Sequence, residues 1–283
     1  MVGVGRALAS VGSLLVLWLL LLGAAPLAAE TPFLTVASTT STEDSGLLAD
    51  LLPRFRAVSG IEVRVVAVGT GQALRVARAG DADLLLVHDR PSEEAFVAEG
   101  YGIERVSVMA NDFVVVGPTT DPAGIRGMGD VAQAFARIAE HEAIFVSRGD
   151  DSGTHKAELR QWRHAGIDPT PASGTWYREL GRGMGGTLNT AAAMQAYSLA
   201  DRGTWLAFLN RAGLDLLVEG DPRLQNPYSA IVVDPERHPH VKAALAQRLV
   251  DWLVSEPGQA AIGAFQVGGE RLFVPRAELA PGP

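Results

Sequence analysis

The sequence contains no cysteine among its 283 residues, so a disulfide framework cannot stabilise the fold. The lack of cysteine also excludes a lipoprotein, whose lipidation needs a cysteine at the cleavage point. Basic residues are in a minority, with 24 Lys and Arg against 32 Asp and Glu and a net charge of −8. This balance disfavours nucleic acid and anionic membrane surfaces as partners. It does not exclude an anionic ligand, because charges more than about 10 Å apart are largely screened at moderate salt.

Long apolar runs are also missing, except at the N-terminus. Arg6 precedes an apolar segment over 11–22, and small residues end in Ala28 and Ala29. This layout is typical of a cleaved secretory signal, so we expect a signal peptide over 1–29 and a mature protein in the periplasm. An uncleaved membrane anchor stays an alternative, because the run from Ala7 to Ala29 is nearly long enough to span a bilayer.

Beyond this segment, strand-like and helix-like stretches alternate, which favours an α/β fold with largely parallel sheets. The remaining length suits two lobes better than one core. Strands are expected at 33–37, 61–68, 84–87 and 144–147, and helices at 47–58, 73–79, 92–99, 130–139, 154–165 and 241–253. A Gly-rich loop at 181–186 is expected to precede a helix over 187–200.

Two extended stretches are placed so that they can carry the chain between lobes. The first is 105–117, which we expect to be interrupted at 110–112, and the second is 228–233. They predict two β-strand crossings at a hinge, with lobe I over 30–113 plus 230–283 and lobe II over 114–229. A ligand would then lie in the cleft at the carboxyl ends of the strands.

Three short turns rich in Ser, Thr and Gly stand out. They are 38–41, 69–71 and 147–154, and each follows an apolar run and opens a helix-like stretch. Such a turn presents free backbone N–H groups, hydroxyl donors and the positive end of a helix dipole. Three of them, with Arg148 inside one, indicate a pocket for a small, multiply charged oxyanion.

A tetrahedral oxyanion needs many donors and no acceptor, unless it carries a proton. Arg148 offers charged, forked donation, and the candidate hydroxyl donors are Thr40, Ser41, Thr70, Ser147, Ser152 and Thr154. Asp150 and Asp151 are expected to act as helix caps that face away from the ion. For any one hydroxyl, plain capping is the alternative role, and for Arg148 it is a surface ion pair with a neighbouring aspartate.

Four segments resemble TupA-type tungstate-binding proteins: 38–48, 147–155, 183–188 and 196–204. The similarity extends over nearly all of the mature chain. It implies the two-lobed periplasmic-binding-protein fold, type II-like, and a monomeric, non-enzymatic receptor of an ABC importer with a membrane permease and an ATPase as partners. It implies tungstate as ligand, without a cofactor or a bound metal ion, and ligand-shell residues Thr40, Ser41, Thr70, Arg148, Ser152 and Thr154. Thr187 and the Leu188 N–H are weaker members of that shell.

Other functions stay open at this point. Molybdate, sulfate and phosphate receptors share the fold, and residue types alone do not rank the ions. A serine hydrolase using Ser152 is a distant alternative, because His155 lies on the same turn and no G-x-S-x-G elbow is present. His238 and His240 lack carboxylate company, so they are expected to face solvent without a metal. The three turns contain no aromatic residue, which disfavours a sugar.

Overall fold

A single long strand, β4 (Gly102–Pro118), runs through the computed structural model, which describes residues 31–276. The predicted signal peptide therefore lies outside the described residues. The other strands of the main sheet are β1 (Phe33–Thr39), β2 (Glu62–Val68), β3 (Leu84–Val87), β7 (Ser198–Asp201), β8 (Leu214–Val218), β9 (Gln225–Val233) and β12 (Val274–Pro275). Two short pairs complete the strands: β5 (Phe145–Ser147) with β6 (Tyr177–Glu179), and β10 (Gln266–Val267) with β11 (Glu270–Arg271).

The main sheet is mixed rather than largely parallel. Its order is β12-β4-β9-β3-β1-β2, with β7 and β8 also paired to β4. β1 runs parallel to β2 and β3, as expected, but β9 runs antiparallel to both β3 and β4. The expectation of largely parallel sheets is wrong because the two connecting strands run in opposite directions and pair with each other.

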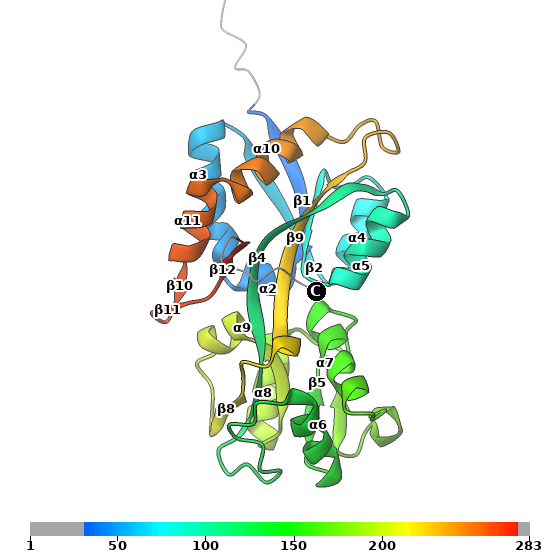
Figure 1. The fold of residues 1–283 in the computed structure, drawn as a ribbon, viewed down its shortest axis with the longest axis vertical. Helices are drawn as coiled ribbons and strands as arrows, with labels where there is room; N and C mark the ends of the chain where they lie inside the picture. The colour runs from blue at the N-terminus through cyan, green and yellow to red at the C-terminus, as the bar shows by residue number, and fades with distance from the viewer. Residues whose placement is uncertain (1–30, 277–283) are drawn as a thin grey trace, which may run out of the picture. The chain divides into compact units, whose positions relative to one another are not determined.

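The two expected crossings are β4 and β9, which lie side by side (Figure 1). The interruption expected at 110–112 is wrong, because β4 continues through it. Ala110, Asn111 and Asp112 there pair with Pro227, Asn226 and Gln225 of β9. The polar residues in this stretch therefore belong to a continuous ladder, and Asn111 and Asn226 are cross-strand neighbours.

The apolar core falls into two groups on either side of this ladder. One group takes its buried side chains from 34–109 and 228–273, and the other from 113–224. We call these regions lobe I and lobe II. The second contains an aromatic cluster in which Trp162 packs against Phe135, Phe145 and Tyr177. These four aromatic side chains are thus core residues of lobe II.

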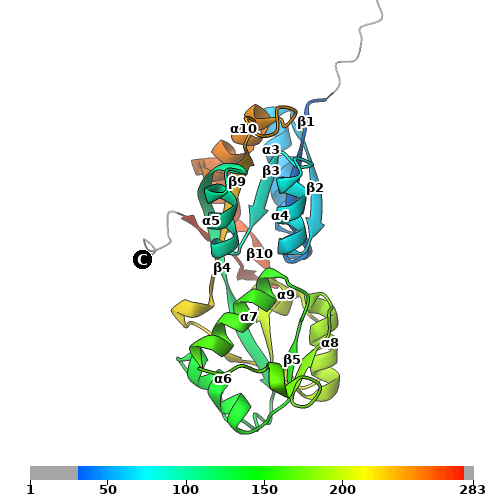
Figure 2. The ribbon, with the colours of Figure 1, turned by 90° about the vertical axis from the view of Figure 1, so that its right-hand side faces the viewer.

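The helices cover the sheet of each lobe (Figure 2). Lobe I carries α2 (Thr40–Asp44), α3 (Leu47–Ser59), α4 (Thr70–Arg78), α5 (Arg90–Ala98), α10 (Ala243–Val254) and α11 (Glu256–Ala264). Lobe II carries α6 (Val131–Glu140), α7 (Gly153–His164), α8 (Met184–Met194) and α9 (Arg202–Ala207), with 3-10 turns at Thr170–Ala172 and Pro222–Leu224. The helix expected over 187–200 is displaced: it begins within the Gly-rich stretch, and 198–201 is strand β7.

Candidate oxyanion site

Each of the three predicted turns connects a strand to a helix. β1 ends at Thr39 before α2, β2 ends before Gly69 and α4, and β5 ends at Ser147 before the loop that leads to α7. The strand-to-helix arrangement expected from the sequence is confirmed at all three. The N-termini of α2 and α4 lie at one edge of the sheet, because β1 and β2 are parallel neighbours.

The first turn is a closely connected group of hydroxyls. Thr39 caps α2, and its Oγ1 accepts the N–H of Thr42 at 3.2 Å and lies 3.1 Å from Oγ of Ser41. Ser41 is buried and Thr40 is half-buried. Capping and ligand binding are therefore not exclusive here, because the cap is Thr39 and leaves the hydroxyls of Thr40 and Ser41 out of that role.

His88, which follows β3 directly, joins this group and was not predicted from the sequence. Its Nε2 lies 3.2 Å from Oγ1 of Thr39 and 3.3 Å from Oγ of Ser41, and its Nδ1 lies 2.9 Å from Oδ1 of Asn226. Burial lowers the pKa of His88 to about 4, although the hydrogen bond with Asn226 opposes the shift. The imidazole is therefore neutral at pH 7. The parallel pairing of β1 with β3 is the signal that places its ring beside the first turn.

The second and third turns each hold a buried hydroxyl that makes no hydrogen bond. Thr70 is fully buried and Thr154 is nearly so, and neither Oγ1 has a partner among residues 31–276. A buried polar group left in this way costs about 1–3 kcal/mol. One such hydroxyl belongs to lobe I and the other to lobe II, and both stand at helix N-termini.

Gly153 brings these two turns together. A Cβ built on it would lie 3.1 Å from Oγ1 of Thr70 and 2.7 Å from Cε1 of His88. Only a residue without a side chain allows the N-terminus of α7 to approach so closely. The structure therefore places the start of α7, in lobe II, against Thr70 and His88 of lobe I.

Arg148 is the charged member of the third turn and is only 3% exposed. Its Nη2 and Nε donate to Oδ2 of Asp150 at 2.6 and 3.1 Å. Burial alone would raise the pKa of Asp150, but hydrogen bonds from Arg148 and Ser152 outweigh it and lower that pKa. The alternative of an aspartate pair is thus present, but it is not a surface pair, because Arg148 is buried and Asp150 is half-buried. It occupies two of the five guanidinium donors.

Ser152 and Asp151 close the third turn in different ways. Ser152 is buried and caps α7, with its Oγ accepting the N–H of His155 at 3.2 Å. Asp151 has a side chain that is 70% exposed and lies 3.9 Å from Nζ of Lys156. The expectation that Asp150 and Asp151 act as helix caps is wrong, because Ser152 caps α7.

Ser147 uses its hydroxyl within lobe II. It donates to Oε2 of Glu158 at 2.7 Å, and Glu158 also accepts from Tyr177 and Trp162. Burial raises the pKa of Glu158 to about 7, and the three donors moderate the shift. The hydroxyl hydrogen of Ser147 is therefore directed into the core and away from a donor role toward an ion.

Thr187 and Leu188 lie inside α8 because that helix begins at Met184. Oγ1 of Thr187 donates to the carbonyl of Gly183 at 3.1 Å, and its N–H bonds to the same oxygen. Leu188 is fully buried at the fifth helical position, where an N–H normally bonds to the carbonyl four residues earlier. The sequence placed the helix start three residues too late, and the free N–H groups belong to Met184, Gly185 and Gly186.

The two lobes also meet through charged side chains beside the third turn. Asp89, at the start of α5, is 2% exposed and accepts from Nη1 of Arg160 at 2.7 Å. Lys156 lies 3.9 Å from the same carboxylate and 3.3 Å from Oγ of Ser92. Burial would raise the pKa of Asp89, but its bonds to Ser92 and Arg160 lower it. We call this contact between α5 and α7 the Asp89 latch.

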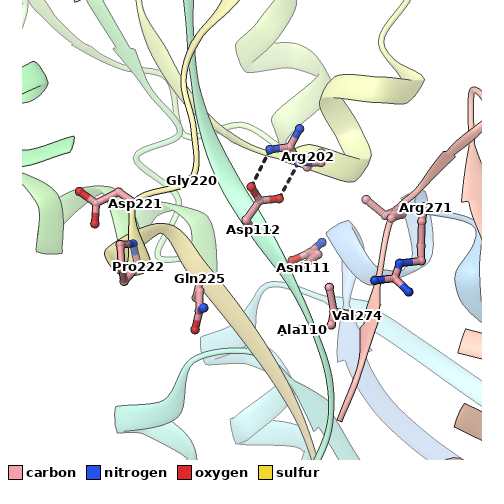
Figure 3. Close-up of a pocket in the computed structure, with 11 residues that line it drawn as sticks. Ala110, Asn111, Asp112, Arg202, Gly220, Asp221, Pro222, Gln225, Arg271 and Val274 are labelled. Atoms are coloured by element: carbon pink, nitrogen blue, oxygen red, sulfur yellow. Dashed lines mark hydrogen bonds and ion pairs between the residues drawn. The ribbon is translucent and has the colours of Figure 1, made fainter. Parts of the chain in front are cut away.

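A separate pocket of about 580 Å³ lies beside the crossing strands (Figure 3). Asn111, Asp112 and Gln225 line it from β4 and β9, and Arg202 lines it from α9. Arg202 is held by Asp112, with its Nε and Nη2 at 2.6 and 2.7 Å from the carboxylate oxygens. None of the predicted ligand residues lines this pocket.

The remaining predictions concern histidines and metals. His238 and His240, which were expected to face solvent, both lie close to carbonyl oxygens of lobe I. Nε2 of His238 is 3.0 Å from the carbonyl oxygen of Arg78, and Nε2 of His240 is 2.9 Å from that of Gly80. Within the described part of the chain, no group of three or more His, Asp or Glu could hold a metal ion. In that same part, no helix is both long and apolar enough to cross a bilayer.

Two lobes that share a pair of crossing strands, with strand-to-helix turns meeting between them, define a solute receptor of the periplasmic-binding-protein class. A family model described as a PBP superfamily domain matches residues 26–257. The tungstate-binding protein TupA of Peptoclostridium acidaminophilum is 48% identical over 246 residues, which cover 86% of this chain and 85% of that protein. The chain belongs to the TupA family.

Two solved structures resemble this chain closely. The tungstate-binding protein TupA from Desulfovibrio alaskensis G20 has a TM-score of 0.78 and 47% identity, covering 87% of this chain and all (100%) of that one. The structure of the tungstate ABC transporter from Geobacter sulfurreducens has a TM-score of 0.75 and 46% identity, covering 82% of this chain and 98% of that one. The expectation of a two-lobed binding-protein fold is confirmed.

Proposed function

We propose that this protein is the extracytoplasmic receptor of an ABC importer and captures a tetrahedral oxyanion, tungstate, between its lobes. The observation that carries the proposal is the close approach of Thr70 to Gly153, the residue before Thr154 at the start of α7. Two buried hydroxyls without partners, from two lobes, stand at helix N-termini whose approach Gly153 permits. An oxyanion accepting from both would satisfy each hydroxyl and would gain from both helix dipoles.

The proposed ligand shell draws on both lobes. Arg148 and the N-termini of α4 and α7 surround the ion with positive potential, and the hydroxyl donors are Thr40, Ser41, Thr70, Ser152 and Thr154. The shell predicted from the sequence also held Ser147, Thr187 and Leu188. Because these three residues make their contacts within lobe II, we propose that they hold the site in place rather than bind the ion. Ser147 fixes the end of β5, and Thr187 and Leu188 fix the start of α8.

The charge balance favours a fully deprotonated dianion over phosphate. A phosphate that keeps a proton would need an acceptor in the shell. Asp150, in the third turn, is a candidate, but its oxygens already accept from Arg148 and from the N–H of Ser152. We propose tungstate as the ligand, rather than molybdate or sulfate, because the related proteins are named as tungstate-binding proteins.

The protein acts without catalysis in this proposal. The hydroxyl of Ser152 accepts a backbone N–H, and Nδ1 of His155 accepts the N–H of Asp151 at 3.1 Å. The imidazole is thus turned to its own loop rather than to Ser152, and a hydrolase that uses this serine lacks its base.

We further propose that the signal peptide is cleaved after Ala29 and that the mature protein is a monomer. We propose the lobe boundaries predicted from the sequence, and we propose that the closed form docks on a membrane permease that an ATPase drives.

The test is titration calorimetry of the mature protein with tungstate, molybdate, sulfate and phosphate. We expect tight binding of tungstate, comparable or weaker binding of molybdate, and weaker binding of the other two. Tight phosphate binding would contradict the role given to Asp150. Heat released only with an amino acid or a sugar would place the protein in another receptor class.

A further inference from the structure

His88 lies where three parts of the molecule meet. It follows β3 of lobe I, its ring carbon limits the approach of Gly153 in lobe II, and its Nδ1 faces Asn226 on a crossing strand. The ring of Tyr228 packs on it with centroids 4.7 Å apart. A buried histidine with a hydrogen-bond partner at each ring nitrogen has one tautomer that satisfies all of them.

The direction of the hydrogen bonds can be followed from the crossing strands outward. Nδ2 of Asn226 donates to Oδ1 of Asn111 at 2.7 Å, so the amide oxygen of Asn226 is the atom that faces His88. An amide oxygen only accepts, and Nδ1 of His88 therefore carries the hydrogen. We call this the His88–Asn226–Asn111 chain.

The other ring nitrogen must then act as an acceptor. A neutral imidazole with its hydrogen on Nδ1 has a lone pair on Nε2. The atoms near Nε2 are the hydroxyls of Thr39 and Ser41, at 3.2 and 3.3 Å. Thr39 is the nearer of the two and is not a member of the proposed ligand shell, so its hydroxyl is the donor to Nε2, and the hydroxyl hydrogen of Ser41 is left for the ion.

We propose that His88 is a positioning residue of the oxyanion site: the His88–Asn226–Asn111 chain holds its ring in the Nδ1–H tautomer, and the bare Nε2 accepts the hydroxyl of Thr39, which leaves the hydroxyl hydrogen of Ser41 free to donate to the ion. This inference rests on the proposed function. Donors that are already oriented need no rearrangement when the ion binds, which is how preorganised sites gain affinity. Because Asn111 and Asn226 are neighbours on β4 and β9, the orientation is tied to the hinge strands.

The first test measures the tautomer in the wild-type protein by long-range ¹H–¹⁵N NMR of the histidine rings. The chain predicts that His88 carries its hydrogen on Nδ1, both without ligand and with tungstate. A hydrogen on Nε2 in either state would overturn the proposal. This measurement does not depend on a variant that folds.

The second test compares two amides in place of His88, by calorimetric titration with tungstate. The oxygen of a glutamine reaches the position of Nε2, whereas the shorter asparagine reaches only the position of Nδ1. We expect His88→Gln to bind within about threefold of wild type and His88→Asn to lose about tenfold or more. His240→Gln and His240→Asn, at an exposed histidine far along the chain, are the matched controls and should both bind as wild type does.

The outcomes separate the two proposals. Equal affinities of His88→Gln and His88→Asn, with wild-type binding of tungstate intact, would overturn the role of His88 and leave the receptor function standing. If wild type bound none of the four oxyanions, the proposed function would fail whatever the tautomer.

Discussion

The two halves of the candidate site are built from different chemistry. Lobe I presents neutral groups, in which Thr39, Ser41 and the neutral His88 are bonded to one another. Lobe II presents charge, with the buried guanidinium of Arg148 held by Asp150. The difference suggests a division of roles: lobe II compensates the charge of an anion, and lobe I supplies donors of fixed direction. Neither half alone offers both.

The largest expected effect comes from removing the charge of lobe II. Arg148→Ala leaves the ion without its cation and Asp150 without its partner, and breaking a buried pair costs about 3–5 kcal/mol. We expect tungstate affinity to fall at least about 100-fold by titration calorimetry. Arg202→Ala, which breaks an ion pair outside the shell, is the control. Wild-type tungstate affinity in the Arg148 variant would remove this residue from the shell.

The lobes should also differ in the sign of their pH dependence. The pKa of Glu158 is raised to about 7, so its contribution to stability is full below its ordinary pKa and is lost as the pH rises toward 7. The pKa of His88 is lowered to about 4 from its ordinary value of 6.5. The contribution of its neutral ring to the free energy of unfolding is therefore full above pH 6.5 and is lost as the pH falls toward 4.

Urea unfolding of Glu158→Gln across pH 4.5–7 isolates the pH-dependent contribution of Glu158 to stability. The variant cannot titrate at this position, so its stability relative to wild type should rise with pH by about 2 kcal/mol. His88→Gln should show the opposite trend, gaining on wild type as the pH falls through the same range. A difference that stays flat with pH in both variants would contradict the assigned protonation states.

Removing one unpartnered hydroxyl should separate binding from stability. Thr70→Val keeps the shape of the side chain and deletes a donor, so tungstate affinity should fall about tenfold. The same change should leave the free energy of unfolding of the ligand-free protein unchanged or raise it by about 1 kcal/mol, because no hydrogen bond is lost. Thr154→Val should behave alike, and the exposed Thr120→Val should change neither quantity. A loss of stability in both buried variants would assign these hydroxyls a structural role.

The smallest expected effect concerns the Asp89 latch between the lobes. Its partners are partly exposed, with side chains of Lys156 and Arg160 at 24% and 31%, so each ion pair is worth about 1 kcal/mol or less. Asp89→Asn should raise the dissociation rate of tungstate a few-fold in stopped-flow measurements, with the association rate little changed. Glu94→Gln, which breaks an exposed pair within α5, is the control. A slower association rate would mean that the latch guides entry instead.

The sequence predicted the three turns and six of the twelve strands described for 31–276, because each of these rests on a local signal. An apolar run followed by Ser, Thr and Gly is read over a few residues, and β3 at 84–87 has the bounds expected. The continuation of β4 through Asn111 was not predictable in this way. It depends on pairing with Asn226, which lies 115 positions away.

The candidate site shows the same limit. Thr70, Arg148 and Thr154 stand in turns with clear local patterns, and the structure buries all three. His88 is a lone histidine after a strand, and nothing near it in the sequence distinguishes it from a core histidine. Its contacts come from β1 and β9, so only the register of the sheet reveals them. The engagement of Ser147 by Glu158 likewise depends on packing within lobe II.

The most direct measurement is the anomalous signal of tungsten in crystals of the protein grown with tungstate. We expect one tungsten atom between the lobes, with its oxygens at about 2.6–3.1 Å from the hydroxyls of both Thr70 and Thr154 and within reach of Arg148. Tungsten bound to one lobe alone, or in the pocket lined by Asn111 and Arg202, would contradict it.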